Sequence, residues 1–289
     1  MADQVGFVGL GVMGGPMSQN MAKKFPVLGF DVSPSRLSAA AGISKAASVA
    51  EIAAACSVIF LSLPSAAIVE EVVLGPAGLA HVMKRGALLV DLSTCLPSVS
   101  RRIAERLASN GVEFADAPVS GGEKGAKEAS LAIMVGASPP VFERSRPFLS
   151  AIGKTAVLVG DVGAGGIAKL VNNMIVASTF AVIAEGMALA ARNGVDVTEL
   201  YEAIREGWAG SKVLDVSAGD IAARRYTPGG TVDMLQKDLS YARALATESH
   251  SPIPMTAAAH EILVAAQAAG FGKSSQPAIF ELWNRSGGA

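Results

Sequence analysis

A long apolar run between Gly160 and Asn193 constrains the fold of this chain more than any other stretch. A glycine-rich entry precedes a helical pattern over residues 166–193, which is about 28 residues or roughly 40 Å long. Gly194 follows, and glycine readily takes the left-handed conformation that ends many helices. The pattern is apolar on nearly every side, which in a soluble protein indicates a helix buried against several neighbours. We therefore expect a central helix on which other elements pack.

Polar side chains are few within this predicted helix. Lys169 and Asn173 lie one turn apart and share a face. A lysine there either extends its ammonium group to solvent or takes part in chemistry, and the helix alone leaves both interpretations open. The most membrane-like part, residues 174–191, carries Glu185 and many alanines. We interpret it as a buried helix and expect no membrane partner.

Composition limits the remaining possibilities. The chain has 289 residues, of which 51% are hydrophobic, and this predicts two domains with sizeable cores. Its 24 basic and 25 acidic residues form no excess of positive charge, so we expect small-molecule partners and no nucleic acid. Cys56 and Cys95 lie in apolar surroundings, which favours a reducing compartment, and no metal-ligand spacing occurs. The N-terminus lacks a basic secretory segment, so we expect a cytoplasmic protein.

A glycine motif near the N-terminus predicts a nucleotide site. Residues 4–8 form an apolar run of strand length, and the segment Gly9-Leu10-Gly11-Val12-Met13-Gly14 leads from it into a helical pattern. The first glycine permits a tight turn, the second lets a pyrophosphate approach the backbone, and the third lets the helix pack closely. Such turns also occur without a ligand. The next strand, residues 27–30, ends at Asp31, where a carboxylate would bind the ribose hydroxyls of NAD. This combination favours a dinucleotide.

Further strands and helices alternate up to about residue 160. Apolar strands are expected at residues 58–63, 88–91, 113–117, 131–135 and 157–159, with helices at 66–73 and 97–110. Strand ends on one side of such a sheet form the ligand crevice, so Leu63, Pro64 and Thr94 are candidate cofactor contacts, although ordinary turn or capping chemistry would also explain them. The segment 117–126 reads as a loop. Its Ser120, Gly121 and Gly122 offer a hydroxyl and open amides that suit a carboxylate.

Four motifs together resemble the β-hydroxyacid dehydrogenase family, which includes 3-hydroxyisobutyrate dehydrogenase and 2-hydroxy-3-oxopropionate reductase. They are GFVGLGVMGGPM at 6–17, DLST at 91–94, DAPVSGG at 116–122 and GAGGIAKLVNN at 163–173. The resemblance spans essentially the whole chain, although many relatives carry glycine where Ala129 stands. It implies that Lys169 is the catalytic acid/base. It also implies that the substrate contacts are Ser120, Gly121, Gly122 and Asn173, and that the cofactor contacts include Leu63, Pro64, Thr94 and Lys237.

The chemistry of an alcohol dehydrogenation agrees with a lysine. A hydride moves to the nicotinamide while the hydroxyl proton moves to a base, and the reverse reaction needs the same group as an acid. A lysine amine has an ordinary pKa of about 10.4, and desolvation beside apolar side chains lowers that pKa toward neutrality. The three histidines lie outside any comparable motif, so we expect them to be surface or core residues.

Beyond Gly194 the strand signals stop, and helices are expected at 196–206, 232–249, 254–269 and 277–285. We therefore predict an α/β N-terminal Rossmann-type domain followed by an all-α C-terminal domain. The first is the dinucleotide-binding domain, residues 1–162, and the second is a helical substrate and oligomerisation domain, residues 163–289. The helix 166–193 would join them and put Lys169 at the cleft between domains, where ligands commonly bind.

The predicted function is hydride transfer between a nicotinamide cofactor and a small 3-hydroxy acid resembling 3-hydroxyisobutyrate. The alternative is an NADPH-dependent reductase of small semialdehydes such as tartronate semialdehyde, glyoxylate or succinic semialdehyde. A dinucleotide sensor without catalysis is disfavoured by the joint presence of Lys169, Asn173 and the Ser120 loop. Asp31 favours NAD, whereas Arg36 keeps NADP as the alternative. We expect a homodimer or homotetramer.

Overall fold

The computed structural model describes residues 4–227 and 229–284. Its chain separates into two compact units, Met1–Lys169 and Leu170–Ala289, called unit 1 and unit 2 below. The division falls inside one long helix rather than in a loop. The boundary predicted between residues 162 and 163, which separates a cofactor domain from a substrate domain, stays a prediction.

Unit 1 is built on one sheet whose strands run in the order β3-β2-β1-β4-β5-β6-β8-β7, with β9 also paired to β8. The strands from β3 to β6 are parallel, while β8 runs antiparallel to β6 and β7. The order reverses between β1 and β4, which is where ligands bind in doubly wound sheets. The bounds are β1 Val5–Val8, β2 Val27–Phe30, β3 Ser44–Lys45, β4 Val58–Leu61, β5 Leu88–Asp91, β6 Glu113–Asp116, β7 Val119–Ser120, β8 Leu131–Gly136 and β9 Gly153–Gly160.

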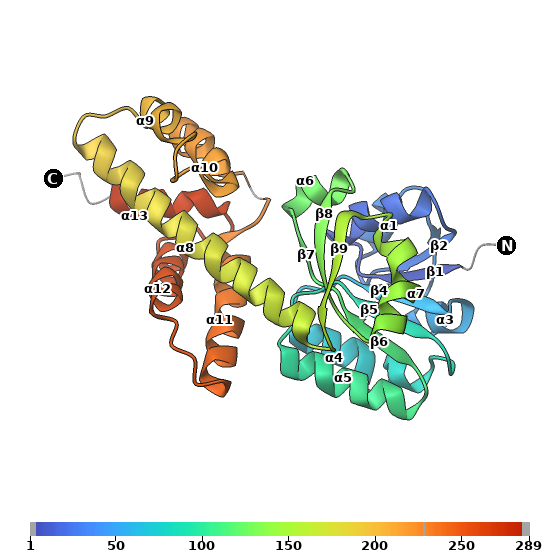
Figure 1. The fold of residues 1–289 in the computed structure, drawn as a ribbon. Helices are drawn as coiled ribbons and strands as arrows, with labels where there is room; N and C mark the ends of the chain where they lie inside the picture. The colour runs from blue at the N-terminus through green and yellow to red at the C-terminus, as the bar shows by residue number, and fades with distance from the viewer. Residues whose placement is uncertain (1–3, 228, 285–289) are drawn as a thin grey trace. The chain divides into compact units, whose positions relative to one another are not determined.

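Helices cover both faces of this sheet, as the apolar strands predicted (Figure 1). On one face, Met17 and Met21 pack in a core cluster with Phe7 and Phe60 of the strands. On the other face, Ile52 lies against Gly6 so closely that a Cβ on that glycine would overlap it. The helices of unit 1 are α1 Gly14–Ala22, α2 Pro34–Ala39, α3 Val49–Ala55, α4 Ala66–Leu74, α5 Pro97–Ser109, α6 Gly122–Lys127 and α7 Pro139–Leu149, with the 3-10 turn η1 at Leu79–His81.

The segment predicted as a loop at residues 117–126 is the main difference from expectation in unit 1. It contains the two-residue strand β7 and most of the six-residue helix α6. Strand β3 was likewise not predicted. Elements this short show no measurable periodicity in the sequence, because a two-residue strand cannot alternate and a six-residue helix completes fewer than two turns.

The long helix α8 runs without a break from Ala164 to Arg192, 29 residues, and Gly194 follows it with a φ of 79°. Its existence, length and glycine stop are confirmed. The expectation of burial on several sides is wrong, because Ile175, Val182 and Leu189 are 63%, 58% and 67% exposed. By length and composition this helix is apolar enough to cross a membrane, and 33% of its most apolar window is buried. Hydropathy alone does not distinguish burial inside one chain from burial against another.

In the described residues of unit 2, the regular secondary structure is helical apart from one isolated bridge between Thr231 and Ser275, and turns and loops connect the helices. It contains part of α8 together with α9 Val197–Ile204, α10 Lys212–Ala223, α11 Val232–Glu248, α12 Pro254–Ala268, the 3-10 turn η2 Gln276–Phe280 and α13 Glu281–Asn284. Asp196 caps α9 by accepting hydrogen bonds from the amides of Thr198 and Glu199, as its sequence position predicted. Helix α10 was not expected. The helix predicted at 277–285 is a 3-10 turn and a short helix, and its last residue lies outside the described residues.

Candidate active site

The glycine loop between β1 and α1 has the close packing that its spacing predicts. Gly9 has a φ of 92°, and a Cβ there would overlap the carbonyl oxygen of Ser62 beyond β4. A Cβ on Gly14 would overlap the carbonyl oxygen of Gly9. At Gly11, by contrast, a Cβ would approach only Arg36 Nη1, at 3.9 Å. A Cβ on Gly11 would therefore extend into nearly open space, which suits the close approach of a phosphate group. The loop that contains this position consists of Gly9, Leu10, Gly11, Val12, Met13 and Gly14.

Asp31 joins the end of β2 to the glycine loop. Its Oδ2 accepts a hydrogen bond from the Leu10 amide at 2.7 Å, and its Oδ1 accepts one from the Ser33 amide at 2.8 Å. The side chain is buried, with 8% exposure. Each carboxylate oxygen has a second lone pair, so Asp31 retains the capacity to accept a ribose hydroxyl. The sequence did not predict that this carboxylate also orders the glycine loop through the Leu10 amide.

The predicted contacts after β4 and β5 are ordered by Asp91, which sequence reasoning had not singled out. Asp91 Oδ1 accepts a hydrogen bond from the Ser93 amide at 2.9 Å, and Ser93 Oγ accepts one from the Leu63 amide at 2.9 Å. This chain of bonds places the loop that bears Leu63 and Pro64 beside the loop that bears Thr94. Burial raises the pKa of Asp91 to about 6, with a further contribution from the charge of Asp116. The sequence feature that could have identified Asp91 is its place as the first residue of the DLST motif.

The segment that bears Ser120, Gly121 and Gly122 is anchored to the glycine-loop helix. Ser120 ends β7, and Gly121 and Gly122 have φ values of 135° and 63° at the start of α6. The buried Asn20 of α1 donates hydrogen bonds to the carbonyl oxygens of Ala126 and Lys127, at 2.7 and 3.1 Å. The segment that bears Ser120, Gly121 and Gly122 therefore has a fixed position in unit 1. Asn20 was not predicted, because its partners are more than one hundred residues away in sequence.

The start of α8, which carries Lys169, is held by Asp116 at the end of β6. Asp116 Oδ1 accepts a hydrogen bond from the Gly163 amide and Oδ2 accepts one from the Gly166 amide, both at 2.7 Å. The carboxylate is buried, with 2% exposure, and burial raises its pKa. Lys169 follows Gly166 by less than one turn and is half-buried.

In unit 2, Asn173 and Lys237 meet at one acid. Asn173 Nδ2 donates a hydrogen bond to Asp238 Oδ2 at 2.7 Å, and Lys237 Nζ lies 3.2 Å from Asp238 Oδ1. The Lys237 ammonium group also lies 5.5 Å from the ring centroid of Tyr241. Two predicted site residues are therefore brought together by Asp238. The signal for it was its place in the QKDL stretch, directly after Lys237.

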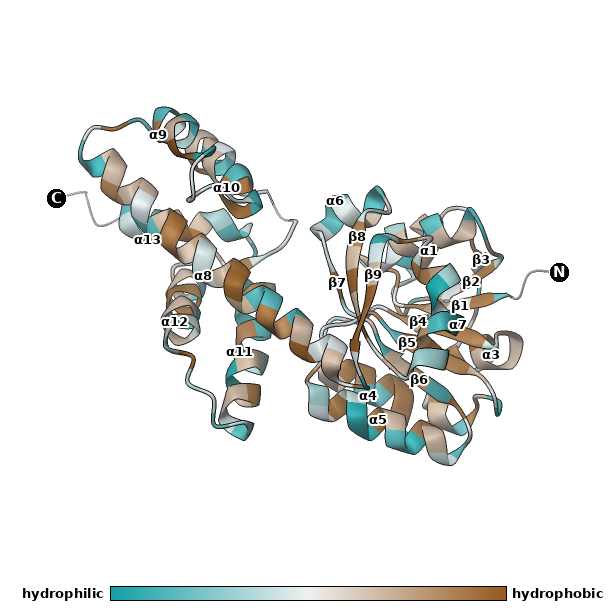
Figure 2. Cartoon of the chain, viewed as in Figure 1, coloured by the Kyte–Doolittle hydropathy of each residue, from teal (hydrophilic) through white to brown (hydrophobic). Residues whose placement is uncertain are grey.

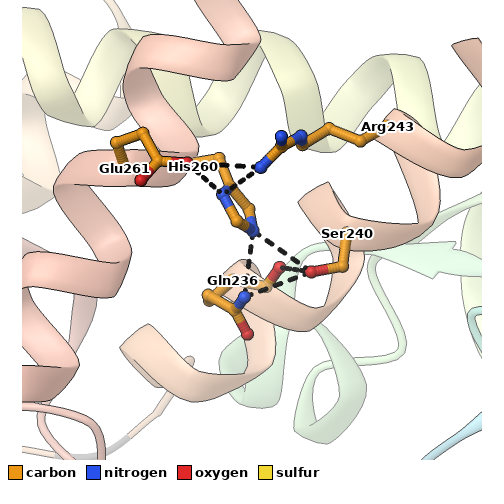
Figure 3. Close-up of polar contacts among 5 residues, drawn as sticks. All are labelled: Gln236, Ser240, Arg243, His260 and Glu261. Atoms are coloured by element: carbon orange, nitrogen blue, oxygen red, sulfur yellow. Dashed lines mark hydrogen bonds and ion pairs between the residues drawn. The ribbon is translucent and has the colours of Figure 1, made fainter.

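A polar cluster around His260 fastens α11, which carries Lys237 and Asp238, to α12 (Figure 3). His260 Nε2 lies 3.0 Å from Gln236 Nε2 and 3.2 Å from Ser240 Oγ, while Nδ1 lies 2.9 Å from Arg243 Nη1. Nδ1 also lies 3.3 Å from Glu261 Oε1. His260 is therefore a core residue, as expected, and His81 and His250 are exposed. Among the described residues, no cluster of histidine, cysteine and acidic side chains is suited to a metal ion.

Two family models cover nearly all of the chain. Residues 4–160 match the NAD binding domain of 6-phosphogluconate dehydrogenase. Residues 163–283 match the NAD-binding domain of NADP-dependent 3-hydroxyisobutyrate dehydrogenase. The boundary between the two matches lies just before α8, and the first match contains the whole sheet.

Individual relatives match over most of their length. The chain is 37% identical to 2-(hydroxymethyl)glutarate dehydrogenase of Eubacterium barkeri, covering 99% of this chain and 96% of the relative. It is 35% identical to 2-hydroxy-3-oxopropionate reductase of Escherichia coli, covering 90% and 89%. The solved structure of Mycobacterium tuberculosis 3-hydroxyisobutyrate dehydrogenase with L-serine superposes with a TM-score of 0.89 at 29% identity, covering 98% of this chain and 99% of that one.

Proposed function

Because the chain belongs to the β-hydroxyacid dehydrogenase family of NAD(P)-dependent oxidoreductases, we propose that it oxidises a small 3-hydroxy acid resembling 3-hydroxyisobutyrate, with Lys169 as the general acid/base. The observation that carries the proposal is the placement of Lys169 just beyond a helix start that is hydrogen-bonded to the sheet. A proton-transfer group has to be held in position to be efficient, and this lysine is carried by an ordered element.

The residues of this chain would divide the reaction as follows. When bound, the nicotinamide accepts or returns a hydride. The glycine loop would hold the pyrophosphate, Asp31 the ribose, and Leu63, Pro64, Thr94 and Lys237 the remainder of the cofactor. Lys169 Nζ would take the hydroxyl proton during oxidation and return it during reduction. Ser120 and the amides of Gly121 and Gly122 would hold the carboxylate, and Asn173 would orient the substrate by hydrogen bonding.

The names of the relatives narrow the substrate class. In both 3-hydroxyisobutyrate and 2-(hydroxymethyl)glutarate, a hydroxymethyl group is attached to the carbon that bears a carboxylate. L-Serine has the same arrangement. We therefore propose a primary alcohol on the carbon next to the carboxylate-bearing one. This places the anion two carbons from the atom that loses the hydride.

The second candidate is reduction of a small semialdehyde with NADPH. It is favoured by the match to 2-hydroxy-3-oxopropionate reductase, since that compound is tartronate semialdehyde. Glyoxylate and succinic semialdehyde are further aldehyde substrates of this second candidate. The two candidates use the same residues in opposite directions, because a group that accepts a proton from an alcohol donates one to an aldehyde.

We also propose a cytoplasmic homodimer or homotetramer with no nucleic-acid or membrane partner. Helix α8 is rich in apolar residues (Figure 2), and the exposure of its Ile175, Val182 and Leu189 supports self-association. A groove of about 670 Å³ runs beside them, lined by residues of α8, α9 and α10 such as Thr179, Gly186 and Leu200. A contiguous apolar surface that is exposed in the isolated chain commonly marks a site of contact with another protein chain. Sedimentation of the purified chain tests the proposal, and a monomeric wild type would contradict it.

The catalytic assignment is tested with Lys169→Ala and Lys169→Arg. Proton transfer contributes about 10² to 10⁴ in rate, so Lys169→Ala should lower kcat by about 10²-fold or more while leaving the affinity for NAD unchanged. Lys169→Arg keeps the positive charge but cannot release a proton, so it should be equally inactive. The exposed Lys154→Ala is the control. Turnover of Lys169→Ala within a few-fold of wild type would show that another group transfers the proton.

The substrate is tested in the same assays. Initial rates would be measured with 3-hydroxyisobutyrate, 2-(hydroxymethyl)glutarate and L-serine in the oxidative direction, and with tartronate semialdehyde, glyoxylate and succinic semialdehyde in the reductive direction. Both cofactors would be used with each. The highest kcat/KM for a semialdehyde with NADPH would favour the second candidate over the first.

A further inference from the structure

We propose that Asp116 is a positioning residue for Lys169, because its carboxylate fastens the first turn of α8 to the end of the sheet. This inference rests on the proposed role of Lys169. Asp116 does not contact the reacting atoms in this proposal. It acts by fixing the helix from which the lysine extends and by placing a negative charge at the beginning of that helix.

The side chain that accepts the hydrogen bonds at the start of α8 comes from a distant strand and not from the residues just before the helix. The first four amides of a helix lack partners within the helix, and a side chain just before the helix commonly satisfies one of them. Here both oxygens of one carboxylate accept from the Gly163 and Gly166 amides, and that carboxylate is 47 and 50 residues away in sequence. The beginning of α8 is therefore attached to strand β6 and not only to the loop that precedes it.

Glycines make this attachment close. A Cβ on Gly165 would overlap the carbonyl oxygens of Asp116 and Met134, and a Cβ on Gly136 would overlap Asp116 Oδ1. The first turn of α8 therefore lies directly against the ends of β6 and β8. Lys169 is three residues beyond Gly166, roughly 4.5 Å further along the helix axis. Its backbone position therefore depends on this contact.

The position matters because proton transfer depends steeply on geometry. A displacement of about 1 Å can lower a rate by about 10²-fold. A helix whose first turn frays would let the lysine move by this amount. The carboxylate of Asp116 prevents fraying at the one end of α8 that carries Lys169.

The charge of Asp116 has a separate consequence. A carboxylate is favoured at the positive end of a helix dipole, and a negative charge near an amine favours its ammonium form. The other ionisable groups around Asp116 are Asp91 on β5, Cys95 after it, which donates to Asp91, and Arg101 on α5. Removing the charge of Asp116 should therefore shift the titration of Lys169 to lower pH, while a purely structural change should not.

The main variant is Asp116→Asn. Asparagine keeps one acceptor oxygen, but to the second backbone amide it presents its side-chain NH2 group, which only donates. We expect kcat for 3-hydroxyisobutyrate oxidation to fall by about 10-fold or more while KM for NAD stays within about two-fold. We also expect the rising limb of the kcat–pH profile to move down by about half a pH unit or more. The control is Asp196→Asn, since Asp196 also accepts two backbone amides at a helix start and asparagine caps equally well there.

Gly166→Ala separates position from charge. Its Cβ would lie 3.3 Å from the Cys95 carbonyl oxygen and 3.7 Å from Asp116 Oδ2, so the first turn should shift by a few tenths of an ångström without overlap. Alanine also favours a helix. We expect kcat to fall several-fold, while the rising limb of the kcat–pH profile stays at the wild-type pH.

The outcomes distinguish this inference from the proposed function. Retained activity in Lys169→Ala would overturn the role of Lys169 and the inference with it. If Lys169→Ala is inactive but folded Asp116→Asn has the wild-type kcat and pH limb, only the inference fails. If Asp116→Asn does not fold, as judged by thermal unfolding and NAD binding, a wild-type kcat in Gly166→Ala overturns the inference and a several-fold loss supports it.

Discussion

The side-chain amide of Asn173 donates a 2.7 Å hydrogen bond to Asp238, 65 residues further along the chain. The other side of the Asn173 amide accepts a hydrogen bond from Asn172 at 2.9 Å, so its orientation is set at both ends. The second oxygen of Asp238 lies 3.2 Å from the Lys237 ammonium group. One buried carboxylate therefore holds a residue assigned to the substrate and a residue assigned to the cofactor.

Asp238→Ala should weaken both ligands together. Loss of the acid leaves the buried Asn173 amide without its acceptor, which costs about 1–3 kcal/mol. We expect KM for the hydroxy acid and KM for NAD each to rise by about 10-fold, with a smaller change in kcat. Steady-state kinetics measure this, with the exposed Asp215→Ala as the control in the same unit. A change confined to one of the two KM values would contradict a shared role.

NAD should give a higher kcat/KM than NADP. The Asp31 carboxylate would repel a 2′-phosphate, and such a repulsion is worth several kcal/mol in a partly desolvated site. Asp31→Ser should narrow the gap between the cofactors. It should also weaken binding of both, because Asp31 holds the Leu10 amide of the glycine loop.

Arg36 provides the comparison for this cofactor preference, since its guanidinium is the group closest to the open side of Gly11. If Arg36→Ala lowers kcat/KM for NADP while leaving NAD unchanged, Arg36 is the group that tolerates the phosphate. A wild-type enzyme that prefers NADP would show that Arg36 outweighs Asp31.

Ser120→Ala should raise KM for 3-hydroxy acids. A hydrogen bond to a charged group contributes about 1.5–3 kcal/mol, which corresponds to a rise of about 10-fold or more. The methyl ester of the same acid should be affected much less. Ser120 is a better target than Gly121, because the φ of 135° at Gly121 would make any side chain there disturb the backbone. Ser130→Ala in the same segment is the control, and equal effects on acid and ester would remove the carboxylate from this position.

Ala129→Gly should stabilise the protein. Ala129 has a φ of 53°, in the left-handed region that disfavours side chains. Relief of that strain exceeds the added entropy of glycine in the unfolded chain by roughly 0.5 kcal/mol. Thermal or urea unfolding should detect the gain. The same substitution at the exposed helical Ala258 should instead lower stability by about 1 kcal/mol.

Asp91 should make stability depend on pH in the direction opposite to most acids. Its folded pKa of about 6 lies above the ordinary value of 3.8, so protonation favours the folded state. Its contribution is complete below the unfolded pKa and is lost as pH rises through about 6. Asp91→Asn cannot ionise, so the free energy of unfolding of the variant should rise relative to that of the wild type by about 2 kcal/mol between pH 4 and pH 7. Urea denaturation at several pH values measures this, and a constant difference would contradict the raised pKa.

The amino-acid sequence by itself determined the features that depend on neighbours in the chain. The glycine turn after β1, the long α8 with its Gly194 stop, and the cap at Asp196 all follow from local backbone preferences. The apolar strands likewise indicated a sheet covered on both faces, since alternation is absent where both faces are buried. The fold class follows from these elements, because parallel strands with helical crossovers have few arrangements.

The tertiary structure alone decided which distant residues meet and which surfaces stay exposed. No local pattern shows that Asp116 binds the start of α8 or that Asp238 binds Asn173. The partners are 47 and 65 residues apart in sequence, and only the folded path of the chain brings them together. Hydropathy likewise identified α8 as apolar but did not show that Ile175, Val182 and Leu189 remain exposed within one chain. Local preferences act over a few residues, whereas burial and long-range hydrogen bonds depend on the path of the whole backbone.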